Sequence, residues 1–340
     1  MNAPEVDDVG YARHPPARVR LATDEGVRLD DRSIPGDGEQ HPVTSRPYVI
    51  MVTHNSASQV GASLDALAGS DVDVHVVDNA SVDTSCTVVR QNYPWVVLRS
   101  RRDNQGVAVA VNEALRSASI HGVVILVNPD CVVAPGTMGA LASYLDDHPA
   151  VGIVGPRLVD AAGVTTISAY PFETRLGVGA TPLRTRAAGH GGARPRSVDW
   201  LSGACLAIRT ELLRQIGGLD ESCVLYVDDV ELCRQAHQRG ADVVLLPAVV
   251  AQHPGWAGRE PGMTGPHLHH SRMTFFARHR PVSLPALRAG LLLRCLPGLA
   301  HAAVEVGSGR PGARRRLRAR WTTVRIVMDF RPPPPRTTRH

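Results

Sequence analysis

Lysine is absent from this chain. All 37 of the Lys and Arg residues in its 340-residue sequence are arginines. The absence excludes a P-loop lysine and a Schiff-base lysine, together with the mechanisms that need one. A G-x-G-x-x-G motif is also missing after the first expected strand, so the dinucleotide fingerprint is absent and a dehydrogenase is disfavoured.

Three other absences bear on where the protein works. The six cysteines form no C-x-x-C pair and show no regular spacing, which is typical of reduced thiols in a cytosolic protein. The first residues are polar and acidic and lack the form of a secretory signal. No uninterrupted apolar run approaches the roughly 18 residues of a membrane span. We therefore expect a cytoplasmic protein, and the apolar content of 43% fits a globular one.

Composition divides the chain into three parts. Residues 1–46 are rich in Asp, Arg, Pro and Gly without hydrophobic period, and we expect a disordered leader there. Residues 47–280 are long enough for one catalytic domain, and residues 281–340 form a basic extension. Within the domain, residues 160–196 are dense in Gly, Ala, Arg and Thr, which favours a long mobile insertion of the kind that often serves as a lid.

The first half of the domain alternates strand and helix patterns. Apolar runs predict strands at 48–53, 74–77, 95–98 and 123–127, with helical spacing between them. Such alternation predicts an α/β fold whose mainly parallel central sheet has right-handed crossovers and flanking helices.

Polar residues follow three of these strands. They are Asn55, then Asp78 with Asn79, then Asn128 with Asp130. Because open α/β sheets bind ligands outside the carboxyl ends of their strands, these side chains should converge on one polar rim suited to a nucleotide.

The sequence Asn128-Pro129-Asp130 follows the most apolar of these strands. Pro129 cannot donate to a sheet ladder, so the strand should end there. A carboxylate held at that point, on Asp130, suits a hard divalent cation carrying phosphates. The alternative is a turn between two apolar runs, because Asn, Pro and Asp are common turn residues.

A second acidic pair, Asp228-Asp229, opens a predicted helix whose Leu232, Cys233 and Ala236 recur at helical spacing. The helix macrodipole favours negative charge there, so the pair is either functional or simply an N-cap with a first-turn acid. His253 ends the strand expected at 243–250, where a lone His is more often a surface residue than a ligand.

The extension carries a predicted amphipathic helix at 287–306, followed by arginines that include Arg314, Arg315, Arg316 and Arg318. A basic amphipathic tail can lie on an anionic membrane surface, and the alternative is a solvated helix. The same arginines could contact phosphodiesters, but no nucleic-acid fold or aromatic stacking platform accompanies them. We therefore expect no nucleic-acid partner.

Several short motifs occur in a fixed order along the chain. They are residues 52–56, 77–81, 104–106 with Asn112, 128–130, 199–205, 217–221, 226–233 and His253. Each is weak alone, but the ordered set spans roughly two thirds of the chain. With these motifs the chain resembles glycosyltransferase family 2 enzymes of the rhamnosyltransferase-like branch, which have the GT-A fold.

The resemblance implies a donor site. Residues 128–130 look like this branch's version of the D-x-D motif, with Asp130 and His253 holding Mg²⁺ or Mn²⁺ against the donor diphosphate. The residues that it assigns to the nucleotide are Thr53, Asn55, Asp78, Asn79, Asn104, Gly106 and Asn128.

The resemblance also implies an inverting mechanism. Asp229 would be the general base that removes the acceptor's proton, and Asp228 would help to position the acceptor. The family's doublet is commonly Glu-Asp, so the shorter Asp228 leaves the division of roles open. Trp200, Ser202 and Gly203 would shape the acceptor and donor-sugar pocket.

Several alternatives remain open at this stage. The branch suggests dTDP-rhamnose as donor, with a UDP-hexose or galactofuranose donor as the alternative. The acceptor is a glycan, a lipid-linked sugar or a small molecule. The location is the cytoplasm, with or without peripheral contact at the inner face of the membrane. Competing functions are a degenerate domain that binds a glycan or nucleotide without turnover, and a membrane-surface scaffold.

Overall fold

A computed structural model describes residues 46–117, 120–172, 194–222, 226–254 and 265–332. The strands are β1 (Tyr48–Thr53), β2 (Asp73–Asp78), β3 (Val97–Ser100), β4 (Val123–Val127), β5 (Val132–Val133), β6 (Val151–Val159), β7 (Ala169–Tyr170), β8 (Arg196–Ser197), β9 (Trp200–Leu201), β10 (Cys205–Arg209) and β11 (Asp242–Gln252). The helices are α1 (Val60–Leu67), α2 (Ser85–Asn92), α3 (Val107–Ser117), α4 (Thr137–Asp147), α5 (Thr210–Ile216), α6 (Asp228–Gln238), α7 (Gly265–His279), the short 3₁₀ turn Pro281–Ser283, α8 (Leu284–Gly307) and α9 (Ala313–Met328).

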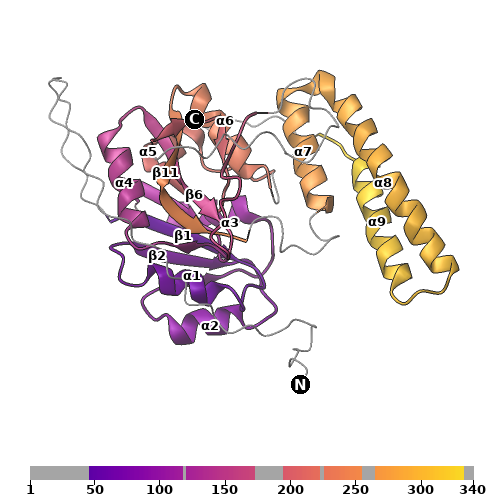
Figure 1. Cartoon of the computed structure of the whole chain (residues 1–340), viewed down its shortest axis with the longest axis horizontal. Helices are drawn as coiled ribbons and strands as arrows, with labels where there is room; N and C mark the ends of the chain where they lie inside the picture. The colour runs from indigo at the N-terminus through magenta and orange to yellow at the C-terminus, as the bar shows by residue number, and fades with distance from the viewer. Residues whose placement is uncertain (1–45, 118–119, 173–193, 223–225, 255–264, 333–340) are drawn as a thin grey trace. The chain divides into compact units, whose positions relative to one another are not determined.

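The central sheet has the order β3-β2-β1-β4-β10-β6-β11-β5 (Figure 1). The first four strands in that order are parallel, as the alternating pattern predicts. Beyond them β10 runs antiparallel to both β4 and β6, β11 is parallel to β6, and β5 is antiparallel to β11. The α/β prediction is confirmed, and the sheet is mixed in its second half.

Helices cover both faces of this sheet, and the central strand β4 shows why. Val123, Ile125 and Val127 belong to a core with α1, α2 and α4, whereas Val124 packs in a second core with α3, α5 and α6. Because successive strand residues point to opposite faces, a strand buried on both sides must be apolar throughout. This accounts for the unbroken run at 123–127.

One predicted strand begins later in the structure. The third strand begins at Val97, because residues 93–96 form a turn closed by a hydrogen bond from the Val96 N–H to the Tyr93 carbonyl. The segment that follows the insertion contains two short strands, β9 and β10. The turn between them is fixed by the Asn128 N–H, which donates to the Ala204 carbonyl.

The insertion predicted at 160–196 is described only at its ends. Residues 173–193, its centre, lie outside the described residues, as does nearly all of the predicted leader. At one end β7 pairs with β9, and at the other β8 pairs with β11. Both described ends are therefore anchored to strands of the domain.

Helices α7, α8 and α9 share an apolar cluster of their own. Its buried members are Met273, Phe276, Leu287, Leu291, Val327 and Phe330. The helix at Pro281–Gly307 is long and apolar enough to cross a membrane by length and composition, with a mean hydropathy of 1.3 over its best window. The sequence search for uninterrupted apolar runs missed it, because Arg288 and Arg294 break the run.

Candidate active site

The loops after β1 and β2 are joined by hydrogen bonds. The Thr53 hydroxyl donates to Asp78 at 2.9 Å, and the Asn55 side-chain oxygen accepts from the Val82 N–H at 2.9 Å. Asn55 is held at a φ of 53°, a left-handed conformation that Asn tolerates better than most residues. Three of the residues assigned to the nucleotide thus lie at one edge of the sheet.

Asp78 is buried and stays ionised. Burial alone raises its pKa, but hydrogen bonds from Ser81 and Thr53 outweigh that effect and lower the pKa below its ordinary value. This carboxylate is therefore a permanent acceptor at the end of β2.

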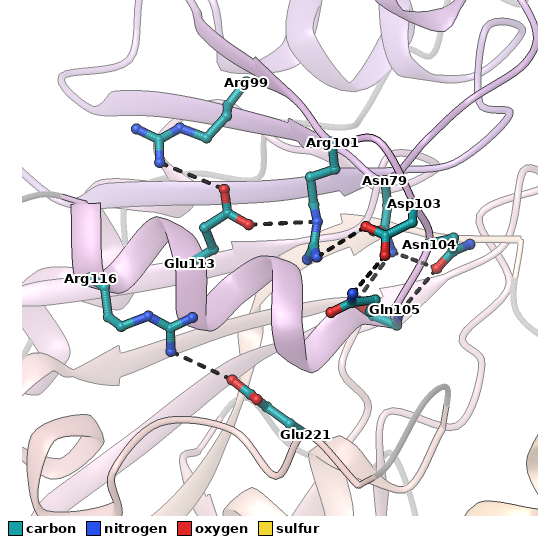
Figure 2. Close-up of polar contacts among 10 residues, drawn as sticks. Asn79, Arg99, Arg101, Asp103, Asn104, Gln105, Glu113, Arg116 and Glu221 are labelled. Carbon is teal, nitrogen blue, oxygen red and sulfur yellow. Dashed lines mark hydrogen bonds and ion pairs between the residues drawn. The ribbon is translucent and has the colours of Figure 1, made fainter.

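Asn79 fixes the loop that opens α3 (Figure 2). Its amide donates to Asn104 at 2.7 Å and to the Gly106 carbonyl at 3.2 Å. Gly106 has a φ of 100°, which favours glycine because it has no Cβ. On α3 itself, Glu113 pairs with Arg99 and Arg101 at 3.8 and 3.5 Å. The loop 104–106 therefore has a fixed position beside the end of β2.

Asp130 and His253 meet because β5 pairs with β11. The register sets Val132 opposite Gln252. The segment just before Val132, which includes Asp130, therefore lies next to His253, which follows Gln252. Nε2 of His253 is 3.2 Å from Oδ1 of Asp130, and the Asp130 side chain keeps 24% of its surface exposed. A partly exposed carboxylate with a buried imidazole nitrogen beside it suits Mn²⁺ or Mg²⁺.

The described residues contain no cluster of three or more His, Cys, Asp or Glu side chains that could hold a metal. A cation at Asp130 and His253 would therefore take its remaining ligands from phosphates and water, which is usual for Mg²⁺. Residues 128–130 are also held from behind, since the Ser63 hydroxyl donates to the Pro129 carbonyl at 2.8 Å.

The acidic doublet occupies the first turn of α6. One Asp229 oxygen accepts from the Gly203 N–H at 3.0 Å and the other from the Val230 N–H at 2.8 Å. A Cβ at position 203 would lie 3.3 Å from the Asp229 Cβ, so glycine allows this close approach. Just before the doublet, Tyr226 and Val227 have φ values of 66° and 70°, a strained conformation that is rare for a β-branched residue.

Both carboxyl groups of the doublet have raised pKa values. Burial raises the pKa of Asp228. Burial, reinforced by the charge of Asp228, raises the pKa of Asp229 to about 7, although the Gly203 and Val230 N–H groups oppose the shift. Asp229 is therefore poised to exchange a proton near neutral pH, which is where a general base is most effective.

One cavity of about 700 Å³ joins these groups. Its wall includes Asn128 and His253 on one side and Asp228 and Asp229 on another. His253 also contacts Asp130, so the pair Asp130–His253 and the acidic doublet lie next to the same cavity.

Residues predicted to shape a sugar pocket also line this cavity: Trp200, Ser202 and Gly203. The Trp200 indole stacks on Tyr170 with ring centroids 4.2 Å apart and donates to the Pro171 carbonyl at 3.1 Å. The pairing of β7 with β9 thus makes one rigid aromatic wall.

Sequence reasoning missed the wall formed by α7. Leu268, Arg272, Phe275 and Phe276 line the cavity from this helix, Arg280 lines it from just after the helix, and Arg234 lines it from α6. The signal was present as a spacing of four residues between Leu268, Arg272, Phe276 and Arg280.

Comparison with known proteins identifies the class. The family model for "Glycosyltransferase like family 2" matches residues 45–274. The N-acetylglucosaminyl-diphospho-decaprenol L-rhamnosyltransferase of Mycobacterium tuberculosis, strains CDC 1551 and H37Rv, is 30% identical over 267 residues, which cover 68% of this chain and 84% of that protein. The chain therefore belongs to glycosyltransferase-like family 2 and is a glycosyltransferase, which confirms the resemblance read from the motifs.

Two solved structures share the fold. The mannosyltransferase PcManGT from Pyrobaculum calidifontis, in complex with GDP-Man and Mn²⁺, has a TM-score of 0.51 at 20% identity, over 84% of this chain and 87% of its own. GalNAc-T7 with UDP, GalNAc and Mn²⁺ also has a TM-score of 0.51, at 15% identity, over 68% of this chain and 47% of its own. The expected GT-A fold is confirmed.

We predict that Asp229→Asn stabilises the folded protein at pH 8. The folded state keeps a proton on Asp229 up to a pKa of about 7, whereas the unfolded chain loses it near pH 4. Wild-type stability should therefore fall as pH rises from 4 to 7 and then level off. The variant cannot lose this proton, so its free energy of unfolding in urea should exceed that of wild type by on the order of 1–2 kcal/mol at pH 8. The difference should be smaller at pH 5.

The matched control is Asp147→Asn, at the exposed end of α4. A gain for Asp229→Asn that is equal at pH 5 and pH 8 would contradict the raised pKa of Asp229.

Proposed function

We propose that this enzyme is an inverting transferase that moves rhamnose from dTDP-rhamnose to a hydroxyl of a sugar carried on a lipid diphosphate. The observation that carries the proposal is the single cavity that contains Asp229, with a pKa near 7, together with His253 beside Asp130. The named activity of the Mycobacterium tuberculosis relative supports the choice of donor sugar and acceptor.

In this proposal Asp229 is the general base. It removes the proton from the acceptor hydroxyl, the oxygen attacks the anomeric carbon, and the bond from that carbon to the nucleotide diphosphate breaks on the opposite face. One base opposite one leaving group gives a single displacement with inversion. The charge of Asp228, the preceding residue on α6, adds to the effect of burial in raising the pKa of Asp229, and Asp228 would also help to position the acceptor.

The donor nucleotide would bind along the edge formed by the loops after β1 and β2. Thr53, Asn55, Asp78 and Asn79 would contact the nucleoside, with the ionised Asp78 accepting from the base. Asn104 and Gly106, fixed by Asn79, would lie by the ribose and phosphates.

Asp130 and His253 would hold a divalent cation, with Asn128 beside them. The two donor atoms, 3.2 Å apart, fit such an ion, and the two solved relatives with Mn²⁺ support it. When bound, the metal neutralises charge on the departing diphosphate. The pairing of β5 with β11 keeps both side chains in place.

The last two helices would keep the enzyme at the cytoplasmic face of a membrane. Leu293 and Val304 of α8 are 66% and 70% exposed. On α9 the exposed residues include Arg314, Arg315 and Arg318, and Glu305 ties the two helices together by accepting from Arg316 at 2.9 Å. Figure 1 shows the two helices running alongside each other. An exposed apolar face beside arginines suits an anionic lipid surface.

We predict that Asp229→Asn lowers kcat by about 10²- to 10⁴-fold, the contribution expected of a general base. Wild-type kcat should rise with pH and level off above about 7, because the base must be ionised. Transfer is measured with dTDP-rhamnose against a panel of UDP-hexoses, and dTDP affinity should not change in the variant. Near-wild-type turnover by Asp229→Asn would remove Asp229 from the mechanism. Faster turnover of a UDP-hexose would replace the proposed donor.

We also predict dependence on a divalent metal. Excess EDTA should lower turnover about 100-fold or more, and Mn²⁺ or Mg²⁺ should restore it. Asp130→Asn and His253→Ala should each weaken Mn²⁺ binding in the presence of dTDP by about tenfold or more in calorimetry. The exposed His121→Ala is the matched control. Full activity in EDTA would argue against a metal at this pair.

A third prediction concerns the membrane. The triple change Arg314→Gln, Arg315→Gln and Arg318→Gln should weaken co-sedimentation with phosphatidylglycerol vesicles by about 100-fold, since each surface arginine contributes about 1 kcal/mol. Arg90→Gln, an exposed change on α2, is the control. Equal binding of wild-type protein to phosphatidylglycerol and phosphatidylcholine vesicles would contradict an electrostatic contact.

A further inference from the structure

Helix α7 presents a mixed row of side chains to the cavity. Leu268, Arg272 and Phe276 follow one another at intervals of four residues, so they share one helix face, and Arg280, the first residue after the helix, also lines the cavity. Arg234 of α6 joins them on the cavity wall. The chamber that contains the acidic doublet therefore also contains three arginines among apolar and aromatic groups.

Two contacts fix the helix in this orientation. Arg278 forms an ion pair with Asp220, which is buried. Nε2 of His279 lies 2.5 Å from the carboxylate of Glu231 on α6. These two contacts hold the end of α7, and with it the adjoining Arg280, in place on the cavity wall.

Two of the arginines have polar atoms that are buried without a partner. Within the described part of the chain, Nε of Arg234 and Nη1 of Arg280 are inaccessible to solvent and have no hydrogen-bond acceptor. These two side chains also form no ion pair with any described residue. Buried polar groups are nearly always hydrogen-bonded, and an unpaired one is costly, so these two guanidinium groups suit an anionic ligand.

Three carboxylates line the cavity, those of Asp160, Asp228 and Asp229, and within the described part of the chain none of them pairs with Arg234 or Arg280. Asp160 accepts from the Ala162 and Val164 N–H groups at 2.9 Å each. Asp229 accepts from the Gly203 and Val230 N–H groups. The positive charge on Arg234 and Arg280 is therefore available to a ligand.

We propose that Arg234 and Arg280, with Arg272, bind the diphosphate of the acceptor, and that Phe275, Phe276 and Leu268 receive the first part of its lipid chain. Guanidinium groups bind phosphate oxygens in pairs, and the neighbouring apolar groups suit an isoprenoid. The assignment rests on the proposed function, because it requires an acceptor sugar linked to a diphosphate.

The position of Arg234 favours the acceptor over the donor. It lies five residues after Asp229 on the same helix, a rise of roughly 7 Å. A sugar whose reacting hydroxyl lies at Asp229 would thus present its far end, which carries the diphosphate, to Arg234. The donor's diphosphate would take its counter-charge from the divalent cation proposed at Asp130 and His253, beside β5 and β11.

The test compares wild-type protein with the double variant Arg234→Gln, Arg280→Gln, and with Arg90→Gln as control. Binding of farnesyl diphosphate is measured by calorimetry in EDTA, which removes any metal contribution. Binding of dTDP with Mn²⁺ is measured in parallel. We expect the double variant to lose about 100-fold in farnesyl diphosphate affinity, about tenfold for each charged contact, with dTDP affinity and thermal midpoint unchanged.

Transfer assays separate this assignment from the proposed function. With an N-acetylglucosaminyl-diphospho-farnesyl acceptor, the double variant should show a KM raised about 100-fold. With octyl N-acetylglucosaminide, which has no phosphate, its KM should equal that of wild-type enzyme. If wild-type enzyme transfers rhamnose to neither acceptor, the proposed function fails, and farnesyl diphosphate binding still tests the arginines.

A further measurement uses only wild-type protein, so it does not depend on a variant that folds. Farnesyl diphosphate should slow the modification of Arg234 and Arg280 by phenylglyoxal, followed by peptide mass spectrometry, whereas dTDP with Mn²⁺ should not. Unchanged farnesyl diphosphate affinity in the double variant, or protection by dTDP alone, would overturn the assignment.

Discussion

The site depends on how β10 enters the sheet. This strand inserts antiparallel between β4 and β6, so the turn before it meets the end of β4, where the Asn128 N–H donates to the Ala204 carbonyl. Gly203, one residue earlier, donates to Asp229. The antiparallel direction of β10 therefore brings the carboxyl group of Asp229 to the sheet edge where residues 128–130 lie. The same principle operates at β5 and β11, where antiparallel pairing sets His253 beside Asp130.

The electrostatics of the cavity separate two kinds of charge. Burial raises the pKa values of Asp228 and Asp229. Asp78, in contrast, accepts several hydrogen bonds that lower its pKa, so it stays ionised. Arg234 and Arg280 line the same cavity as the doublet, and each keeps one buried nitrogen that has no hydrogen-bond acceptor among the described residues. This arrangement stabilises the apo protein poorly, and it is typical of a chamber built to contain charged ligands.

The sequence predicted the first four strands and the elements around residues 128–130 and 228–229, because these signals are local. The β-branched run at 123–127, with Gly122 before it and Pro129 after it, is typical of a short strand buried on both faces. The mixed second half of the sheet was not predictable in this way. The direction of β10 depends on which strands it pairs with, and its apolar pattern is the same in either direction.

Helix α7 was missed for a related reason. Its face toward the cavity mixes arginine with apolar residues, so it lacks the clean amphipathic period of a core helix. The contacts that define it, Arg278 with Asp220 and His279 with Glu231, join residues more than forty positions apart. The roles of residues 217–221 could likewise be read only from structure: Asn112 bonds both backbone groups of Leu219, which makes this motif an anchor for the neighbouring Asp220.

The left-handed backbone at Tyr226 and Val227 has a consequence for anyone who redesigns this enzyme. A β-branched residue in that conformation is strained by on the order of 1–3 kcal/mol, and glycine at 227 would release the strain. The released backbone would also be free to turn, and α6 begins at the very next residue. A substitution at this position that raises stability would thus loosen the orientation of the Asp228 and Asp229 carboxylates. Stabilising substitutions should therefore be sought elsewhere in the chain.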